Sequence, residues 1–244
     1  MKTLVIIPSR LSATRLPGKP LLKINGLSMI SHVFKKAEEA NIGEVYVAAE
    51  DQEIIDDVNK NGGQAILTSN NHKTGTDRVF EALKKIGKPD VELVMNLQGD
   101  EPLMGVEDIR NLHNQMLKTK SEMGTLASEI KDKKFFQKEN IVKVLTKQSL
   151  LNFEFPEAIN FMRKSSDLND NIYHHLGIYC YRVETLKNFV SLDQSQNEII
   201  SRLEQLRALD NNIKIKVSLA KESPIGVDTE EDLMAIKKLM EYKL

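Results

Sequence analysis

Short apolar runs alternate with amphipathic segments along the first half of the chain. The apolar runs predict strands at residues 5–7, 44–49, 64–67 and 93–97. Apolar residues that recur at helical spacing predict helices at residues 28–40, 51–60, 76–86 and 106–118. Strands that alternate with helices in this way are typical of a parallel sheet covered by helices. The pattern therefore predicts an α/β fold with a mostly parallel, doubly wound sheet.

Two helix starts can be assigned from capping residues. Thr76 is the expected N-cap of the helix that runs to about Ile86, because a threonine hydroxyl can accept a hydrogen bond from the first turn. Thr229 is followed three residues later by Asp232, which is the spacing of a capping box at the start of the last helix. The predicted buried stripe of that last helix consists of Leu233, Ile236, Leu239 and Met240.

The stretch from about 130 to 172 interrupts this alternation. It begins with a charged run at 131–134, continues with an apolar run at 141–145 and ends in polar residues at 164–171. We interpret it as an insertion or flap with its own strands and not as a separate domain. The whole chain, residues 1–244, is therefore expected to form a single domain, which its length allows.

Composition argues against several classes of protein. The 34 basic and 35 acidic residues nearly cancel, which argues against a nucleic-acid partner. The single cysteine, Cys180, excludes a disulfide framework within the chain and a cysteine-based zinc cluster. No apolar run approaches the roughly 20 residues that span a bilayer, and no signal peptide precedes the first strand. We therefore expect a soluble cytoplasmic protein with no membrane partner.

The segment 8–21, which follows the first predicted strand, carries three cations, Arg10, Arg15 and Lys19. Ligands of open α/β sheets bind at the carboxyl ends of the strands, and cations placed there commonly contact phosphate. The alternative is a solvated basic loop whose charges face water. We expect a phosphate-binding site.

Two acidic residues are expected at the same edge of the sheet. Asp100 follows the strand at 93–97, and Asp228 lies directly before the last helix, where Thr229 already suits the cap. A carboxylate beside phosphate groups is repelled unless a cation intervenes, and Mg²⁺ is commonly held by one or two carboxylates together with phosphate oxygens. Asp100 and Asp228 are therefore candidate magnesium ligands. The structural alternatives are a turn aspartate and a helix-start residue.

Other segments carry weaker signals. Thr74–Thr76 form a glycine-containing turn into a helix, where free N–H groups can contact an anion or a nucleobase. The histidines 174–175 lie on a predicted strand, so alternation sends them to opposite faces, and either can be a hydrogen-bonded core residue. In the predicted helix 203–207, Glu204 and Gln205 look like surface residues. The sequence has no G-x-G-x-x-G and no P-loop, which argues against a dinucleotide oxidoreductase or a P-loop kinase.

Taken in order, these segments resemble the 3-deoxy-manno-octulosonate cytidylyltransferases, also called CMP-Kdo synthetases. The matching stretches are Ile7–Leu21, Thr74–Arg78, Asn96–Pro102, His174–Tyr179, Leu203–Arg207 and Val227–Leu233. Each stretch alone is moderately specific, but together they span nearly the whole chain at family-like spacing. The opening loop differs from that of the sialic-acid-activating relatives, which favours the Kdo branch.

The resemblance implies a Rossmann-like nucleotidyltransferase fold, with a mostly parallel mixed sheet flanked by helices, and a homodimer whose contacts come largely from the insertion at 130–172. It implies an Mg²⁺-dependent enzyme for lipopolysaccharide synthesis. The anomeric hydroxyl of Kdo would attack the α-phosphorus of CTP and release pyrophosphate, with no Ser, Cys or His nucleophile.

The resemblance also implies roles for individual residues, with Asp100 and the three loop cations forming the catalytic set. The residues implied to hold the triphosphate are Arg10, Arg15 and Lys19, and those implied to hold magnesium are Asp100 and Asp228. Those implied to help place CTP are Gln98, Thr74, Gly75 and Thr76. Those implied to bind the acidic sugar are Arg163, His175, Glu204 and Gln205.

This sequence departs from the family pattern on the sugar side. Met162 stands where family members often have serine before the sugar-binding arginine, and the segments 165–166 and 194–198 also differ. One alternative is therefore a cytidylyltransferase for a related acid sugar such as 8-amino-Kdo. The other is a nucleotide-binding protein without catalysis, which the retention of Asp100 and Asp228 argues against.

Overall fold

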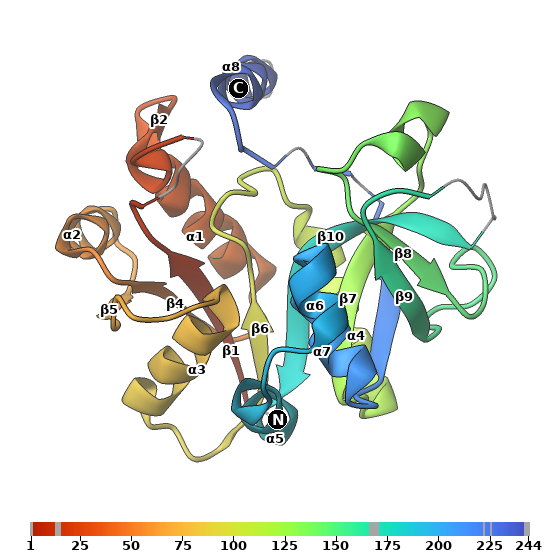
Figure 1. Cartoon of the computed structure of the whole chain (residues 1–244). Helices are drawn as coiled ribbons and strands as arrows, with labels where there is room; N and C mark the ends of the chain where they lie inside the picture. The colour runs from red at the N-terminus through yellow and green to blue at the C-terminus, as the bar shows by residue number, and fades with distance from the viewer. Residues whose placement is uncertain (1, 13–15, 166–170, 222, 225, 242–244) are drawn as a thin grey trace. The chain divides into compact units, whose positions relative to one another are not determined.

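Figure 1 shows the computed structural model of the protein, which describes residues 2–12, 16–165, 171–221, 223–224 and 226–241. The chain forms two compact units. The first contains residues 1–109 and 224–244, and the second contains residues 110–223. This division does not test the predicted single domain with an insertion at about 130–172, which stays a prediction.

The first unit is built on a sheet with the strand order β6-β1-β4-β5. Its strands are β1 (Lys2–Ser9), β4 (Glu44–Ala49), β5 (Ala65–Leu67) and β6 (Val91–Asn96). Their pairings are parallel, and Ile6 is aligned with Tyr46 on one side and with Asn96 on the other. The four residues from Leu4 to Ile7 are at most 1% exposed, so both faces of β1 are covered. The predicted parallel sheet is therefore confirmed for this unit.

The helices of the first unit lie close to their predicted positions. They are α1 (Met29–Ala40), α2 (Gln52–Lys60), α3 (Gly75–Ile86) and α8 (Glu230–Glu241), with the short 3₁₀ helix η1 (Lys19–Leu21). A small hairpin of β2 (Lys23–Ile24) and β3 (Leu27–Ser28) precedes α1. Helix α4 (Val106–Thr119) begins in the first unit and ends in the second.

The start of α3 differs from the prediction. Thr74 is the cap: its hydroxyl accepts a hydrogen bond from the Asp77 N–H at 3.2 Å, and the Asp77 carboxylate accepts one from the Thr74 N–H at 3.2 Å. Thr76 lies inside the first turn and is buried, so its predicted capping role is wrong. The reciprocal pair requires an acidic residue three positions after the cap, and only Thr74 has one. The start of α8 is confirmed, because Thr229 and Asp232 cap each other.

Helix α8 covers one end of the first unit. Leu233 and Ile236 are buried and Met240 is partly buried, whereas Leu239 is 44% exposed, so its predicted place in the buried stripe is wrong. The spacing explains the difference, because positions 233, 236 and 240 share one helical face and 239 lies beside it. The buried residues that pack in this cluster are Ile24, Met29, Val227, Leu233 and Ile236, and Leu16 packs against them. The cluster therefore joins the segment before α8 to the basic loop.

The second unit has a mixed sheet in which β7, β10 and β8 lie between β11 and β9. Its strands are β7 (Met123–Ser128), β8 (Lys143–Thr146), β9 (Ala158–Met162), β10 (Ile172–Arg182) and β11 (Ile215–Leu219). The pairing of β11 with β7 is parallel, and the other pairings of this unit are antiparallel. Its helices are α5 (Val183–Ser191), α6 (Gln196–Ser201) and α7 (Gln205–Asp210), with the 3₁₀ helix η2 (Lys133–Gln137).

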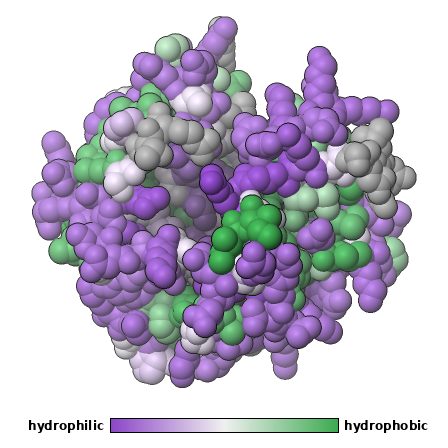
Figure 2. All heavy atoms as spheres, viewed as in Figure 1, coloured by the Kyte–Doolittle hydropathy of each residue, from purple (hydrophilic) through white to green (hydrophobic). Residues whose placement is uncertain are grey.

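The face of the protein shown in Figure 2 is mostly hydrophilic, with a small hydrophobic patch over α6. Ile199 and Ile200 of that helix are 54% and 70% exposed. Within the described ranges, every helix is too short or too polar to cross a membrane.

Candidate active site

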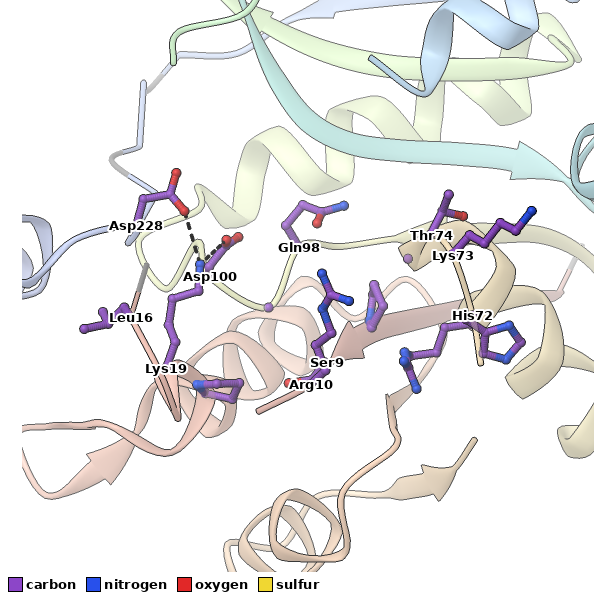
Figure 3. A pocket seen from close by; sticks show the side chains of 15 residues that line it. Ser9, Arg10, Leu16, Lys19, His72, Lys73, Thr74, Gln98, Asp100 and Asp228 are labelled. Atoms are coloured by element: carbon purple, nitrogen blue, oxygen red, sulfur yellow. Dashed lines mark hydrogen bonds and ion pairs between the residues drawn. The ribbon is translucent and has the colours of Figure 1, made fainter. Parts of the chain in front are cut away.

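A cavity of about 330 Å³ lies in the first unit at the carboxyl ends of β1 and β6. This volume suits a small-molecule ligand. The predicted site residues that line it are Arg10, Lys19, Thr74, Gly75, Gln98, Asp100 and Asp228. Figure 3 shows Lys19 and the two aspartates at one end of the cavity and the segment 72–74 at the other, with Arg10 and Gln98 between them. The cavity therefore lies at the sheet edge where the sequence predicted a phosphate site.

The basic loop is anchored to the sheet through its backbone. The Leu11 N–H donates to Asp51 Oδ2 at 2.7 Å, which ties the loop to the end of β4. Gly18 has a φ of 67°, in the left-handed region that favours glycine, and it leads into η1. Arg10 lines the cavity and is exposed, so its guanidinium can reach a ligand. Arg15 lies outside the described residues, and its role stays a prediction.

Lys19 joins the two predicted magnesium ligands. Its Nζ donates to Asp100 Oδ2 at 2.7 Å and to the Val227 carbonyl at 2.7 Å, and it lies 3.4 Å from Asp228 Oδ1 (Figure 3). The Val227 N–H donates to the Asp100 carbonyl at 2.9 Å, so the backbones of these two segments are also joined. Thr229 provides the cap of α8, and the Asp228 carboxylate lies beside Lys19. Three predicted site residues from distant parts of the sequence therefore lie within contact distance.

The opposite end of the cavity is formed by the start of α3. Thr74 and Gly75 line it, whereas Thr76 is 2% exposed and does not. Gln98 lines the cavity where the chain leaves β6. At Gly99, an added Cβ would lie 3.1 Å from the Pro8 carbonyl oxygen, which is closer than about nine in ten contacts of real Cβ atoms. Glycine therefore allows the two strand ends to approach each other at the floor of the cavity.

In the second unit, the Arg163 guanidinium holds three backbone carbonyls. Its Nε donates to Ser201 O at 2.8 Å, its Nη1 to Glu139 O at 3.1 Å and its Nη2 to Arg202 O at 2.8 Å. A guanidinium has five N–H donors, so two of them lie outside these bonds. The predicted contact of Arg163 with a sugar carboxylate stays a prediction. The structure adds a second role, which is to hold the turn between α6 and α7 in place.

His175 is a buried, neutral histidine in this structure. It is 7% exposed, and its Nε2 lies 3.0 Å from Thr125 Oγ1, which in turn donates to the Ile178 carbonyl at 2.7 Å. Since the threonine hydroxyl has one hydrogen, this network assigns the proton of His175 to Nε2. Burial, and then the neighbouring His174, lowers the pKa of His175 to about 3. The Nδ1 of a neutral ring is an acceptor, and the predicted sugar contact stays a prediction.

The interpretation of Gln205 as a surface residue is wrong, whereas the Glu204 side chain is 28% exposed and lies partly at the surface. Gln205 is 6% exposed, and Glu204 Oε1 is shielded from solvent and lies 3.8 Å from Arg207 Nη2. Arg207 is itself buried in an ion pair with Glu198, with a distance of 2.6 Å from Nη2 to Oε1. The helix begins only at Gln205, so the apolar spacing at 203, 206 and 209 does not define its buried side. Their predicted role in sugar binding stays a prediction.

Comparison with known proteins identifies the family. Residues 4–215 match the family model described as cytidylyltransferase. A 3-deoxy-manno-octulosonate cytidylyltransferase from Rhodopseudomonas palustris (strain BisB18) is 43% identical, over 99% of this chain and 98% of its own. An enzyme of the same name from Haemophilus influenzae (strain ATCC 51907 / DSM 11121 / KW20 / Rd) is 37% identical, over 98% of this chain and 99% of its own. This chain belongs to the 3-deoxy-manno-octulosonate cytidylyltransferase family.

Solved structures agree with this membership. The structure of a CMP:2-keto-3-deoxy-manno-octonic acid synthetase complexed with CTP matches all of this chain and all of that one, with a TM-score of 0.90 and 34% identity. A UDP-glucose pyrophosphorylase complexed with UDP-glucose matches with a TM-score of 0.75 and 14% identity, which shows the fold alone. The predicted family and the predicted nucleotidyltransferase fold, a mostly parallel mixed sheet flanked by helices, are confirmed. The predicted dimerisation insertion stays a prediction.

Arg78 is a residue of the cavity for which the sequence suggested no role. It is 3% exposed, lines the cavity and donates to Thr68 Oγ1 at 2.6 Å and to the Ser69 carbonyl at 3.1 Å. It also forms an ion pair with Glu50 at the end of β4. The sequence did offer one signal for Arg78, which is a cation next to the apolar residues of the inner face of α3. Its partner could not be found from the sequence, because Glu50 lies far away along the chain and shares no motif with it.

The acidic end of the cavity fits a divalent cation. Asp100, Asp228 and the Val227 carbonyl provide hard oxygen donors, which Mg²⁺ prefers, and the Lys19 ammonium stands among them as a cation. The adjacent Glu101 has a buried Oε2 with no hydrogen-bond partner among the described residues. Burial, and then the charge of Asp100, raises the pKa of Glu101 to about 8, while Lys19 lowers it. Two carboxylates, Asp100 and Asp228, against one ammonium leave this end of the cavity with a net negative charge, which a divalent cation in place of the ammonium would offset.

Proposed function

We propose that this member of the 3-deoxy-manno-octulosonate cytidylyltransferase family transfers the cytidylyl group of CTP to Kdo and releases pyrophosphate. The observation that carries the proposal is the cavity in which Arg10 and Lys19 lie with Asp100 and Asp228. The cations suit a triphosphate, and the carboxylates suit the magnesium that accompanies it. A role in lipopolysaccharide synthesis and a cytoplasmic location, where CTP is available, are part of the proposal.

The residues of the basic loop would act on the leaving group. The anomeric hydroxyl oxygen bonds to the α-phosphorus as the bond to pyrophosphate breaks, and negative charge develops on the leaving phosphates. Arg10 and Lys19, together with Arg15, would offset that charge, and one such contact is typically worth about 10²–10³ in rate. When bound, magnesium supplies further neutralisation of phosphate charge and lowers the pKa of the attacking hydroxyl. A protein nucleophile is not needed.

The remaining cavity residues would place the nucleotide. Thr74 and Gly75 line the cavity at the start of α3, and N–H groups of a first helical turn can donate to a base or to a phosphate. The Thr74 N–H is already bonded to Asp77, so Gly75 is the candidate donor of this pair. The Gln98 amide can donate and accept a hydrogen bond. Thr76 is buried, so its predicted contact would have to use its backbone.

The second unit would bind the acidic sugar through the predicted residues Arg163, His175, Glu204 and Gln205. The two Arg163 N–H groups outside its carbonyl bonds suit a carboxylate, and the neutral His175 suits a hydroxyl. The homodimer implied by the family belongs to the proposal as well.

A panel of sugar acids tests the proposed function. Pyrophosphate release from CTP and Mg²⁺ is measured with Kdo, with 8-amino-Kdo and with a sialic acid. Turnover with Kdo is the expected result. Turnover with 8-amino-Kdo alone would identify that sugar as the substrate instead. This alternative is included because Met162 departs from the family pattern next to the predicted sugar-binding Arg163. Binding of CTP without turnover on any acid would contradict the assignment as an enzyme.

The carboxylates can be tested in the same assay. We expect Asp100→Asn or Asp228→Asn to lower pyrophosphate release by at least about 10²-fold, because each substitution removes a charge that would hold the metal. The circular dichroism spectrum and the unfolding midpoint should stay close to those of the wild type. Near-normal turnover by either variant at saturating Mg²⁺ would show that these residues do not hold the metal.

A further inference from the structure

Lys19 is surrounded by oxygen atoms as a bound metal ion would be. Its Nζ lies 2.7 Å from Asp100 Oδ2, 2.7 Å from the Val227 carbonyl and 3.4 Å from Asp228 Oδ1. An ammonium group has three N–H donors and no acceptor, so these three oxygens account for its donors. The Lys19 side chain is 14% exposed, whereas the side chains of Asp100 and Asp228 are 33% and 43% exposed. Of these three side chains, that of Lys19 is therefore the least accessible.

The same oxygen atoms are the ones that suit the divalent cation. Magnesium is held at about 2.0–2.1 Å from its oxygen ligands, so an ion shared by Asp100 and Asp228 would lie close to the present position of Nζ. Two positive charges at such a distance repel each other strongly in a partly buried site. The Lys19 ammonium in this position and a metal ion shared by both carboxylates therefore exclude each other.

Only the side chain of Lys19 would have to move to make room. The backbone of η1 is held by the hydrogen bond from the Leu21 N–H to the Gly18 carbonyl at 2.9 Å, and Pro20 is buried. The lysine stem is flexible and its end faces the cavity. Phosphate groups in the cavity would offer the ammonium new acceptors. They would also supply some of the ligands that two carboxylates leave open around a metal ion.

We propose that the Lys19 ammonium occupies the metal position until nucleotide binds. Metal binding therefore depends on the nucleotide. Without nucleotide, the ammonium keeps Asp100 and Asp228 together and keeps the divalent cation out. When nucleotide phosphates take the ammonium, both carboxylates become available to the metal. The inference rests on the proposed function and deepens it, because it assigns an order in which the two ligands occupy the site.

Binding of Mn²⁺ to the full-length protein without nucleotide tests this inference, and it involves no turnover. The free Mn²⁺ is measured by electron paramagnetic resonance. Lys19→Met removes the ammonium but keeps a stem of similar length. We expect this variant to bind Mn²⁺ about tenfold more tightly than the wild type, a usual size for the coupling between two ligands. The double variant Lys19→Met/Asp100→Asn is expected to lose this gain, because one of the two carboxylates is then neutral.

Lys23→Met is the matched control. Lys23 lies in the same part of the chain and pairs with Asp57 at 2.8 Å, so its substitution removes the same charge outside the cavity. We expect its affinity for Mn²⁺ to stay within about twofold of the wild type, because exposed charges are screened. An equal gain in Lys23→Met, or no gain in Lys19→Met, would show that Lys19 does not exclude the metal.

Thermal unfolding provides a second measurement that also reports on folding. Without metal, Lys19→Met is expected to melt below the wild type, because Asp100 and Asp228 are left without the ammonium between them, and Mg²⁺ is expected to restore the midpoint. A loss of stability that Mg²⁺ does not restore would overturn the inference. The proposed function would stand in that case as long as Asp100→Asn still loses pyrophosphate release. Persistent release by Asp100→Asn would contradict the metal assignment itself.

Discussion

At the residue scale, two lysines show how the acceptors around an ammonium group decide whether it can move. Lys143 is fully buried and donates to the carbonyls of Lys138 at 2.7 Å, Ile141 at 2.8 Å and Arg163 at 2.6 Å. Burial, and then the charge of Lys164, lowers its pKa to about 8. These neutral acceptors belong to the backbone of the segment before β8 and of the residue that follows β9, so releasing them would disrupt the fold. Lys19 instead contacts two carboxylates, and a second cation can replace it there.

The buried histidine leads to a prediction about pH. The pKa of His175 is about 3 in the folded protein, because of burial and then of His174, whereas an unfolded histidine titrates near 6.5. Between these values the unfolded chain binds a proton that the folded protein does not, so the free energy of unfolding falls as pH falls from about 6.5 toward 3. We expect His175→Gln to reduce that fall by up to about 1.4 kcal/mol per pH unit.

Urea unfolding at several pH values between about 6 and 4 measures this slope. The slope is the relevant quantity, because the substitution also removes the contact with Thr125 and lowers stability at every pH. The value at neutral pH serves as the internal reference. A slope equal to that of the wild type would mean that the pKa of His175 is not lowered in the folded protein, because the contributions of other groups are the same in both proteins.

At the element scale, helix starts depend on pairs of residues and not on single ones. Thr74 and Thr76 are both suitable caps by type, and the position of Asp77 decides between them. The same rule operates in α6, where the hydroxyl of Ser195 accepts a hydrogen bond from the Glu198 N–H. Glu198 also forms the buried ion pair with Arg207, so one carboxylate both caps α6 and connects it to α7.

The cap of α3 can be tested by substitution. We expect Thr74→Ala to lower the free energy of unfolding by about 0.5–2 kcal/mol, because the hydroxyl that accepts from the Asp77 N–H is lost. Thr74→Ser keeps the hydroxyl and should stay close to the wild type. Both values come from urea unfolding at neutral pH. Equal losses in the two variants would show that the threonine methyl group, and not the hydrogen bond, stabilises this position.

At the scale of the whole molecule, the two units were not equally predictable. The first unit has buried parallel strands separated by amphipathic helices, so its sequence carries a clear signal for each element. The second unit contains β7, whose residues are all buried, and β10, which is long and changes register between Leu176 and Tyr179. Such strands are defined by partners far along the chain. Their place in a sheet cannot be assigned from local pattern.

The proposed homodimer can be tested by substitutions at exposed apolar residues. In the predicted insertion at 130–172, the apolar residues Leu151, Phe153 and Ile159 are 61%, 49% and 54% exposed. If this segment forms the dimer contact, Ile159→Asp should weaken dimerisation by at least about tenfold, because it places a charge in an apolar interface. Sedimentation velocity measures the monomer fraction. Ile200→Asp, at a 70% exposed position of α6, is the control.

Two outcomes would contradict this arrangement. A wild type that is monomeric at all concentrations would exclude the dimer. Dissociation caused by Ile200→Asp but not by Ile159→Asp would place the contact at the hydrophobic patch over α6 and not in the insertion.

The sequence by itself determined the parallel sheet of the first unit, the family and seven of the fifteen residues that line the cavity. These features depend on local periodicity and on motifs whose residues lie next to each other along the chain. Tertiary structure decided that Lys19 lies between Asp100 and Asp228, that Arg78 pairs with Glu50 and that Gln205 is buried. Charge and polarity are visible in a sequence, but the partner of a charge is set by which chain segments the fold brings together.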